Sequence, residues 1–121
     1  MSNLFLGLAG ASGFLSVAFG AFGAHALKAR ISTEMMAVFQ TGNLYHQIHA
    51  VALLVIAGML QGSHQSAVVL AGWLFLFGTL VFSGSLYALA LTEIKVLGAI
   101  TPIGGVAFLA GWVLLLLASF R

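Results

Sequence analysis

The chain has 121 residues, of which 62% are hydrophobic and 5% are charged, with a formal net charge of +2 and no cysteine. Soluble domains carry about a quarter of their residues as charged residues, so this composition excludes a water-soluble globular domain. It also excludes disulfides, thiolate metal sites and iron–sulfur clusters, and four scattered basic residues predict no nucleic-acid partner.

The few charged residues lie between long uncharged runs or at the end of the chain. They are Lys28, Arg30, Glu34, Glu93, Lys95 and Arg121. Because a charge in hydrocarbon is costly, this placement predicts an integral membrane protein whose expected partner is the lipid bilayer. The uncharged runs do not alternate as barrel strands do, so we expect an all-α fold. The sequence therefore predicts a four-transmembrane-helix bundle that forms a single membrane domain over 1–121.

The first predicted span covers about 4–26 and carries small residues at every fourth position. These are Ser12, Ser16, Gly20 and Ala24. Small residues at this spacing let two helix backbones approach closely in lipid. The line either packs inside the monomer or forms the seam of a homo-oligomer. His25 ends this span and either caps the helix or reaches Glu34 across the loop, which makes the two a candidate loop-side site.

The second predicted span covers about 44–61, with a helical approach that starts near 33, where Ser32 or Thr33 can cap the helix. It contains the candidate intramembrane site, which consists of Gln40, Asn43, Tyr45, His46 and His49. Residues three and four apart share a helix face. Polar groups at membrane depth are costly unless they are paired, so we expect this face to turn into the bundle.

His46 and His49 allow three interpretations. They could hydrogen-bond to a hydroxyl of the third span (Thr79, Ser83, Ser85 or Tyr87), belong to a quinone, substrate or proton site, or ligate a metal or haem. A helix that starts at 33 places His46 about 20 Å along its axis, deep in the membrane. If 33–43 lies along the interface, His46 is near the membrane edge instead.

The third predicted span covers about 67–91, and the fourth covers about 96–120 after a tight turn at 92–95. Pro102 lies inside the fourth span and lacks a backbone N–H, so we expect a bend near 101–105. The loops 27–33 and 92–95 hold three basic residues, whereas the other side holds only Arg121. The positive-inside rule therefore places these loops in the cytoplasm and both termini outside, on the periplasmic side.

Catalytic groups are scarce in the predicted spans. No acidic residue lies within them, and there is no glycine-rich phosphate loop. We therefore expect no enzyme activity, no catalytic residue and no metal site, and no cofactor follows from the sequence. The leading interpretation is a non-enzymatic accessory or packing protein that self-associates or joins a larger membrane complex. The alternatives are a small transporter or permeation module lined by the Gln40–His49 face, and a haem, metal or quinone binder that uses His46 and His49.

Two segments resemble a known family. They are Phe19-Gly20-Ala21-Phe22-Gly23-Ala24-His25-Ala26-Leu27 and Tyr45-His46-Gln47-Ile48-His49-Ala50. Together with the length and the four-span plan, they are similar to the YgdD-like family of small uncharacterised bacterial inner-membrane proteins. The resemblance implies a location in the inner membrane and a four-helix architecture. It implies no reaction, and it draws attention to His25, Tyr45, His46 and His49.

Overall fold

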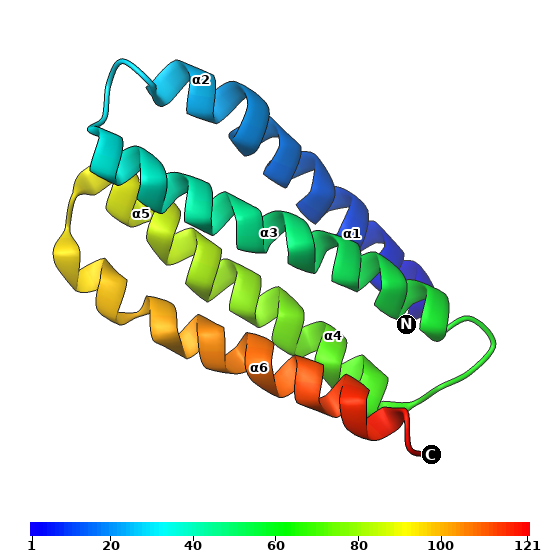
Figure 1. The fold of residues 1–121 in the computed structure, drawn as a ribbon. Helices are drawn as coiled ribbons and strands as arrows, with labels where there is room; N and C mark the ends of the chain where they lie inside the picture. The colour runs from blue at the N-terminus through cyan, green and yellow to red at the C-terminus, as the bar shows by residue number, and fades with distance from the viewer.

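The computed structural model describes residues 1–121 as four helical rods in an antiparallel arrangement, without any strand (Figure 1). The first rod joins α1, η1 and α2, the second is α3, the third joins α4, η2 and α5, and the fourth joins η3 and α6. The bounds are α1 Ser2–Val17, η1 Ala18–Gly23, α2 Ala24–Leu27, α3 Thr33–Met59, α4 Ser66–Gly78, η2 Thr79–Ser83, α5 Gly84–Thr92, η3 Lys95–Ala99 and α6 Thr101–Ala118. The predicted all-helical fold is confirmed. Both termini lie at the same end of the bundle (Figure 1).

α3 is the central rod. It packs against the first rod on one side and against the third rod on the other, and α6 packs against the third rod. The tightest core lies toward the end that holds the termini, where Phe5, Leu53, Ile56, Val68 and Phe75 are fully buried. Large apolar side chains also cover the outside. This surface is the reverse of that of a soluble protein and suits a lipid environment.

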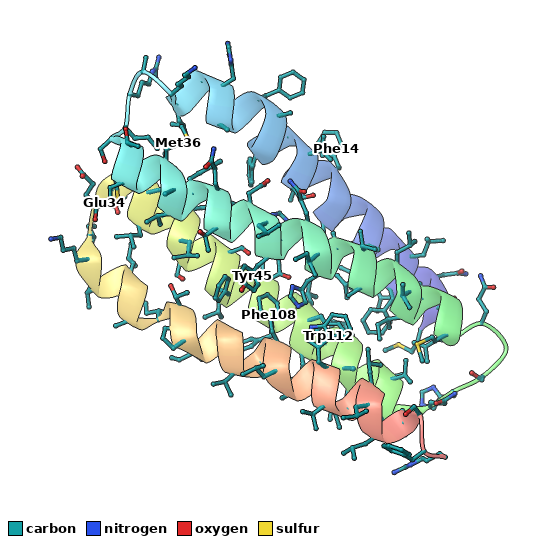
Figure 2. The ribbon with its side chains drawn as sticks, viewed as in Figure 1. Phe14, Glu34, Met36, Tyr45, Phe108 and Trp112 are labelled. Carbon is teal, nitrogen blue, oxygen red and sulfur yellow. The ribbon has the colours of Figure 1, made fainter.

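Outward-facing aromatic residues illustrate this surface. Phe14 is 74% exposed and Phe22 is 76% exposed. Figure 2 shows Phe14 pointing away from the bundle. In water, side chains of this size would favour aggregation, whereas in a bilayer they contact hydrocarbon directly.

Residues at the helix ends explain where the rods begin and stop. The Ser32 hydroxyl accepts a hydrogen bond from the backbone N–H of Met35, so it caps α3, and Glu34 lies in the favourable first turn. α3 then runs without interruption from Thr33 to Met59, so the segment 33–43 is part of the same helix as the predicted second span. Glu93 ends α5 with φ of 57°, a left-handed conformation that reverses the chain toward η3.

Glycines bring α6 close to the third rod. A Cβ atom at Gly104 would overlap the backbone of Phe82, and a Cβ at Gly111 would lie 2.6 Å from the Phe75 ring. A Cβ at Gly78, on the opposite rod, would lie 2.5 Å from Phe108. Because lipid offers no hydrophobic driving force between helices, such close backbone contact is a main source of stability in membrane bundles.

Three rods are long and apolar enough to cross a membrane: Ser2–Leu27, Ser66–Thr92 and Lys95–Ala118. The prediction of four apolar spans is therefore met for only three of them. α3 has 27 residues but falls short in apolar character. The reason is the cluster of amides and imidazoles around its middle, where the other rods carry aliphatic side chains.

The bend expected at Pro102 is not where the sequence analysis placed it. The fourth rod begins with the 3₁₀ segment η3, passes an irregular residue at Ile100, and enters α6 with Pro102 in the first turn. The first turn of a helix has unpaired N–H groups in any case, so proline is tolerated there without a kink. The irregularity thus lies before Pro102, near the membrane end of the rod.

Two rods contain π-helical turns, η1 in the first and η2 in the third. π-helical turns are rare, and they occur often at functional sites because they alter which side chains share a face. Both turns here lie in rods that flank the first half of α3, where the polar residues are found.

Candidate functional site

The polar residues of α3 divide between the inside and the outside of the bundle. Asn43, His46 and His49 are buried, with exposed fractions of 6%, 5% and 3%. Gln40 and Tyr45 are exposed, and so is Gln47. The expectation that this whole face turns inward is therefore wrong for the two glutamines and for Tyr45. A stretch of ten residues covers nearly three helical turns, so its polar side chains cannot all share one face.

His46 connects α3 to two other rods. Its Nδ1 lies 2.9 Å from the Tyr87 hydroxyl on α5, and its Nε2 lies 3.1 Å from the Ser12 hydroxyl on α1. Tyr87 is one of the four partners considered from the sequence, and the structure shows this contact. Ser12 was expected only as a small packing residue. We call these three side chains the His46 row.

Asn43 extends the His46 row by one turn of α3. Its amide nitrogen donates to the backbone carbonyl of Ser16 at 2.8 Å and to the Tyr87 hydroxyl at 3.1 Å. The carbonyl can only accept, so it fixes the orientation of the amide. A Cβ at Gly20 would overlap the Asn43 side chain, so glycine is needed here for the first rod to approach α3. The line Ser12, Ser16, Gly20 therefore packs inside the monomer.

A groove lies beside the His46 row, between the first and third rods. It has a volume of about 290 Å³, is open on one side, and has mainly apolar walls that include Leu8, Leu15 and Leu76. Ser12, His46 and Tyr87 face it, and η2 contributes Thr79 and Ser83 to its wall. It joins an apolar volume to a few polar groups, as ligand sites do.

His49 occupies a different environment, on the α6 side of α3. Its ring stacks on Phe108 with centroids 3.6 Å apart and planes 6° from parallel. Phe75 and Trp112 complete an aromatic cage around it. Its Nδ1 lies 2.8 Å from the Tyr45 carbonyl, and the indole N–H of Trp112 donates to its Nε2 at 3.1 Å. Figure 2 shows Tyr45, Phe108 and Trp112 between α3 and α6.

The two histidines do not form a shared ligand pair. Each imidazole has both nitrogens engaged, and the partners come from different rods. No group of three or more metal-ligating side chains comes together in the structure. The geometry thus gives no support to joint ligation of a metal or haem by His46 and His49.

The candidate loop-side site is not assembled. His25 lies in the last turn of the first rod and Glu34 lies in the first turn of α3, and both side chains are exposed. His25 is placed where a helix end favours positive charge, which agrees with the capping interpretation.

The outer face of α1 and α3 carries a shallow, continuous depression. Hollows of about 230, 550 and 180 Å³ follow one another along the two helices. The first two share Gly20 and Gln47, and the last two share Gly13 and Val51. The side-chain amide of Gln47 lies in this depression and donates to Asn43 Oδ1. The side-chain carbonyl of Gln47 accepts no hydrogen bond within the protein. We call this surface the α1–α3 face.

Sequence reasoning missed Ser12 and Trp112 as hydrogen-bonding partners. Ser12 belongs to a line of small residues, and Trp112 lies among apolar residues of the fourth span. Nothing local marks either one, because their roles depend on which rods become neighbours. The composition held one useful signal. Buried imidazoles require hydrogen-bond partners, and few side chains in the spans can donate or accept.

Comparison with known proteins places the chain in context. Residues 19–105 match a family described as protein of unknown function, DUF423. UPF0382 membrane protein SAB0533 of Staphylococcus aureus is 47% identical over 119 residues, which cover 98% of this chain and 97% of the relative. UPF0382 membrane protein YwdK of Bacillus subtilis is 43% identical over 120 residues, which cover 98% of both chains. No solved structure matches.

These relatives confirm the expectation of an uncharacterised family of membrane proteins. The match covers both histidine-bearing segments, from 19–27 to 45–50. The names of these relatives specify a membrane protein and no reaction.

Proposed function

The chain belongs to the DUF423 family, whose relatives are UPF0382 membrane proteins, and from this premise we propose that it is a non-enzymatic accessory protein that binds a second copy of itself. In this proposal it lies in the bacterial inner membrane, in keeping with the YgdD-like resemblance of its histidine segments. The observation that carries the proposal is Gln47, a carboxamide exposed at the middle of α3 on a surface of small residues.

The proposal includes a fourth crossing of the membrane by α3. At 1.5 Å per residue, its 27 residues extend about 40 Å, which exceeds a hydrocarbon core of about 30 Å. It packs along its length between apolar rods, and Asn43, His46 and His49 point inward. A helix surrounded by other helices tolerates polar residues that a lipid-exposed helix does not.

The orientation in the proposal follows from the basic residues. The end of the bundle opposite the termini holds Lys28, Arg30 and Lys95. The end that holds the termini has Arg121 alone among lysines and arginines. The positive-inside rule then puts both termini on the periplasmic side.

Self-association is supported by the α1–α3 face. A Cβ atom at Gly10 or Gly13 would meet nothing within 4 Å, so these glycines are not needed for packing inside one protomer. They leave a flat surface on which another helix can come close. In a symmetric dimer, a twofold axis beside Gln47 would let each Gln47 carbonyl accept from the amide of the partner protomer. Such interhelical hydrogen bonds contribute about 0.6–2 kcal/mol in membranes.

A larger membrane complex is the alternative occupant of this face. The transporter alternative receives less support, because the polar residues from Gln40 to His49 do not line one path. Asn43, His46 and His49 are buried, whereas Gln40 and Gln47 lie on the α1–α3 face.

The test is the oligomeric state of the full-length protein in liposomes, measured by single-molecule photobleaching over a range of protein-to-lipid ratios. We expect a dimer for the natural sequence. Gly13→Leu adds bulk on the α1–α3 face and Gln47→Leu removes the amide, and each should weaken association at least about tenfold. Leu109→Ala is the control, since Leu109 is 68% exposed on α6, away from this face.

A monomer at every ratio would reject the proposal, as would a dimer that both face variants leave unchanged. A stable assembly that contains a different protein and only one copy of this chain would establish the larger complex instead.

A further inference from the structure

One hydrogen of the His46 row has no acceptor within the protein. Tyr87 and Ser12 carry one O–H each, and a neutral imidazole carries one N–H, so the row has three hydrogens. It contains only two hydrogen bonds, Tyr87 to Nδ1 and Ser12 to Nε2. Asn43 does not take the third hydrogen, because its nitrogen faces the row and donates to Tyr87 and to the Ser16 carbonyl, while its Oδ1 accepts from Gln47.

The spare hydrogen belongs to Ser12 or to Tyr87, depending on the imidazole tautomer. If Tyr87 donates to Nδ1, then the Nε2–H donates to Ser12, and the Ser12 O–H is free. If Ser12 donates to Nε2, then the Nδ1–H donates to Tyr87, and the Tyr87 O–H is free. Both residues line the groove between the first and third rods. In either state the row therefore leaves one donor at the groove.

The groove itself offers no evident match for this donor. Its aliphatic side chains carry no acceptor. The hydroxyls of Thr79 and Ser83 donate to the backbone carbonyls of Phe75 and Gly42 and form no hydrogen bond with Ser12 or Tyr87. A hydroxyl hydrogen left unpaired in an apolar medium is unfavourable. An occupant that brings an acceptor would satisfy it, and an occupant with a second donor would not.

The depth of His46 in the membrane, which follows from the proposed crossing by α3, limits which molecules can bring an acceptor to the groove. His46 is the fourteenth of 27 residues in α3, near the centre of the helix. The ester carbonyls of phospholipids lie at the edge of the hydrocarbon core, about 15 Å from its midplane. Isoprenoid quinones, by contrast, dissolve in the hydrocarbon and carry ring carbonyls, which only accept hydrogen bonds.

We propose that the groove binds the ring of an isoprenoid quinone, with one ring carbonyl accepting the free hydrogen of Ser12 or Tyr87. The volume of about 290 Å³ is at the lower end for ligand sites, which fits a ring without its tail. The tail leaves through the open side of the groove into the bilayer. Ser12, His46 and Tyr87 are positioned by three different rods, and η2 shapes the wall beside them. This site is separate from the α1–α3 face and does not depend on the oligomeric state.

The test uses two probes of the same shape, 2,3-dimethyl-1,4-naphthoquinone and 2,3-dimethylnaphthalene, which lacks the oxygens. Each is titrated into full-length protein in nanodiscs of phosphatidylcholine, and binding is corrected for partition into empty nanodiscs. We expect the quinone to bind about tenfold more tightly, as one hydrogen bond in an apolar site provides. The infrared stretching band of one carbonyl should shift to lower wavenumber in the bound quinone.

A groove-filling variant tests the location without altering the His46 row. Gly84 lines the groove, and a Cβ there meets nothing within 4 Å, so Gly84→Leu should fold and fill the volume. It should weaken quinone binding at least tenfold. Gly7→Leu is the control, because Gly7 also has open space but lies outside the groove.

Equal affinity for the two probes would overturn the proposal, as would a carbonyl band that does not shift on binding. Unchanged binding by the Gly84→Leu variant would place the quinone elsewhere and would also overturn it. Absence of quinone binding above partition, with phospholipid retained in the groove, would assign the site to a lipid chain.

Discussion

The indole N–H of Trp112 donates a hydrogen bond to Nε2 of His49 across 3.1 Å, and this contact fixes the tautomer of the imidazole. Indole can only donate, so Nε2 must accept. The hydrogen of a neutral ring then lies on Nδ1, which donates to the Tyr45 carbonyl at 2.8 Å. A side chain of α6 thus determines which nitrogen of a histidine on α3 carries hydrogen.

Trp112→Phe should destabilise the protein although an aromatic ring is retained. The substitution leaves His49 Nε2 without a donor inside an aromatic cage, which should cost about 1–3 kcal/mol. Thermal unfolding in a mild detergent measures the loss. The matched control is Trp73→Phe, because Trp73 packs on Phe5 at 5.2 Å but makes no side-chain hydrogen bond. Equal shifts for the two variants would show that the ring and not the N–H is responsible.

Asn43→Leu should separate the first rod from α3 and α5. It keeps a similar size but removes the donors to the Ser16 carbonyl and to Tyr87, and we expect a loss of about 1–3 kcal/mol. Hydrogen exchange of α1 amides should accelerate more than that of α6 amides. Thr41→Val is the control, because the Thr41 hydroxyl bonds only to Ala37 of its own helix. A uniform change in exchange would contradict a local role.

Glycine-to-alanine substitutions should change the free energy of unfolding in opposite directions at two kinds of position. At Gly104 the new Cβ overlaps the backbone of Phe82, so Gly104→Ala should destabilise by about 1–3 kcal/mol. At Gly7 the Cβ has open space, and Gly7→Ala should stabilise the helix by about 0.5–1 kcal/mol. Unfolding midpoints of the two variants provide the comparison. A stable Gly104→Ala variant would mean that η2 and α6 are farther apart than described.

Membrane orientation can be read with single cysteines, because the natural chain has none. Ser63→Cys lies in the loop between α3 and α4, on the side of the termini, and should react with an impermeant maleimide added to intact spheroplasts. Lys95→Cys lies at the other end and should react only after the membrane is opened. The reverse pattern would contradict this topology, either by inverting it or by removing the crossing by α3. Reaction of both from outside would exclude a crossing by the rod Ser66–Thr92, which separates the two positions.

The rods were predictable from the sequence because hydrophobic runs and loop charges set them. The span expected over 67–91 corresponds to a rod over Ser66–Thr92, and that over 4–26 to a rod over Ser2–Leu27. A local rule also limited the cap of α3 to Ser32 or Thr33, and in the structure the cap is Ser32. Proline was misjudged because its effect depends on whether it falls inside a helix or in its first turn, and apolar residues on both sides concealed that boundary.

The contacts of the site were only partly predictable. Polar spacing on α3 indicated buried imidazoles, and Tyr87 was among the expected partners of His46. Ser12 and Trp112 could not be assigned, because they come from rods whose rotation is set by close packing at Gly20 and Gly111. The exposure of Gln47 was also missed, since a face argument treats a run of polar residues as one surface.

The widened turn η1 has a consequence for how such chains can diverge. Its i→i+5 bonding accommodates one residue more than an α-helix of equal height, just where the first rod meets Asn43. Loss of a single amino acid within Ala18–Gly23 would restore a regular helix and barely move the ends of the rod. Because a π turn absorbs its extra residue within one turn, the residues on either side would keep their register, and Ser12 would still face His46. A one-residue gap in this segment of a homologue would therefore leave both the interior contacts and the membrane topology unaltered.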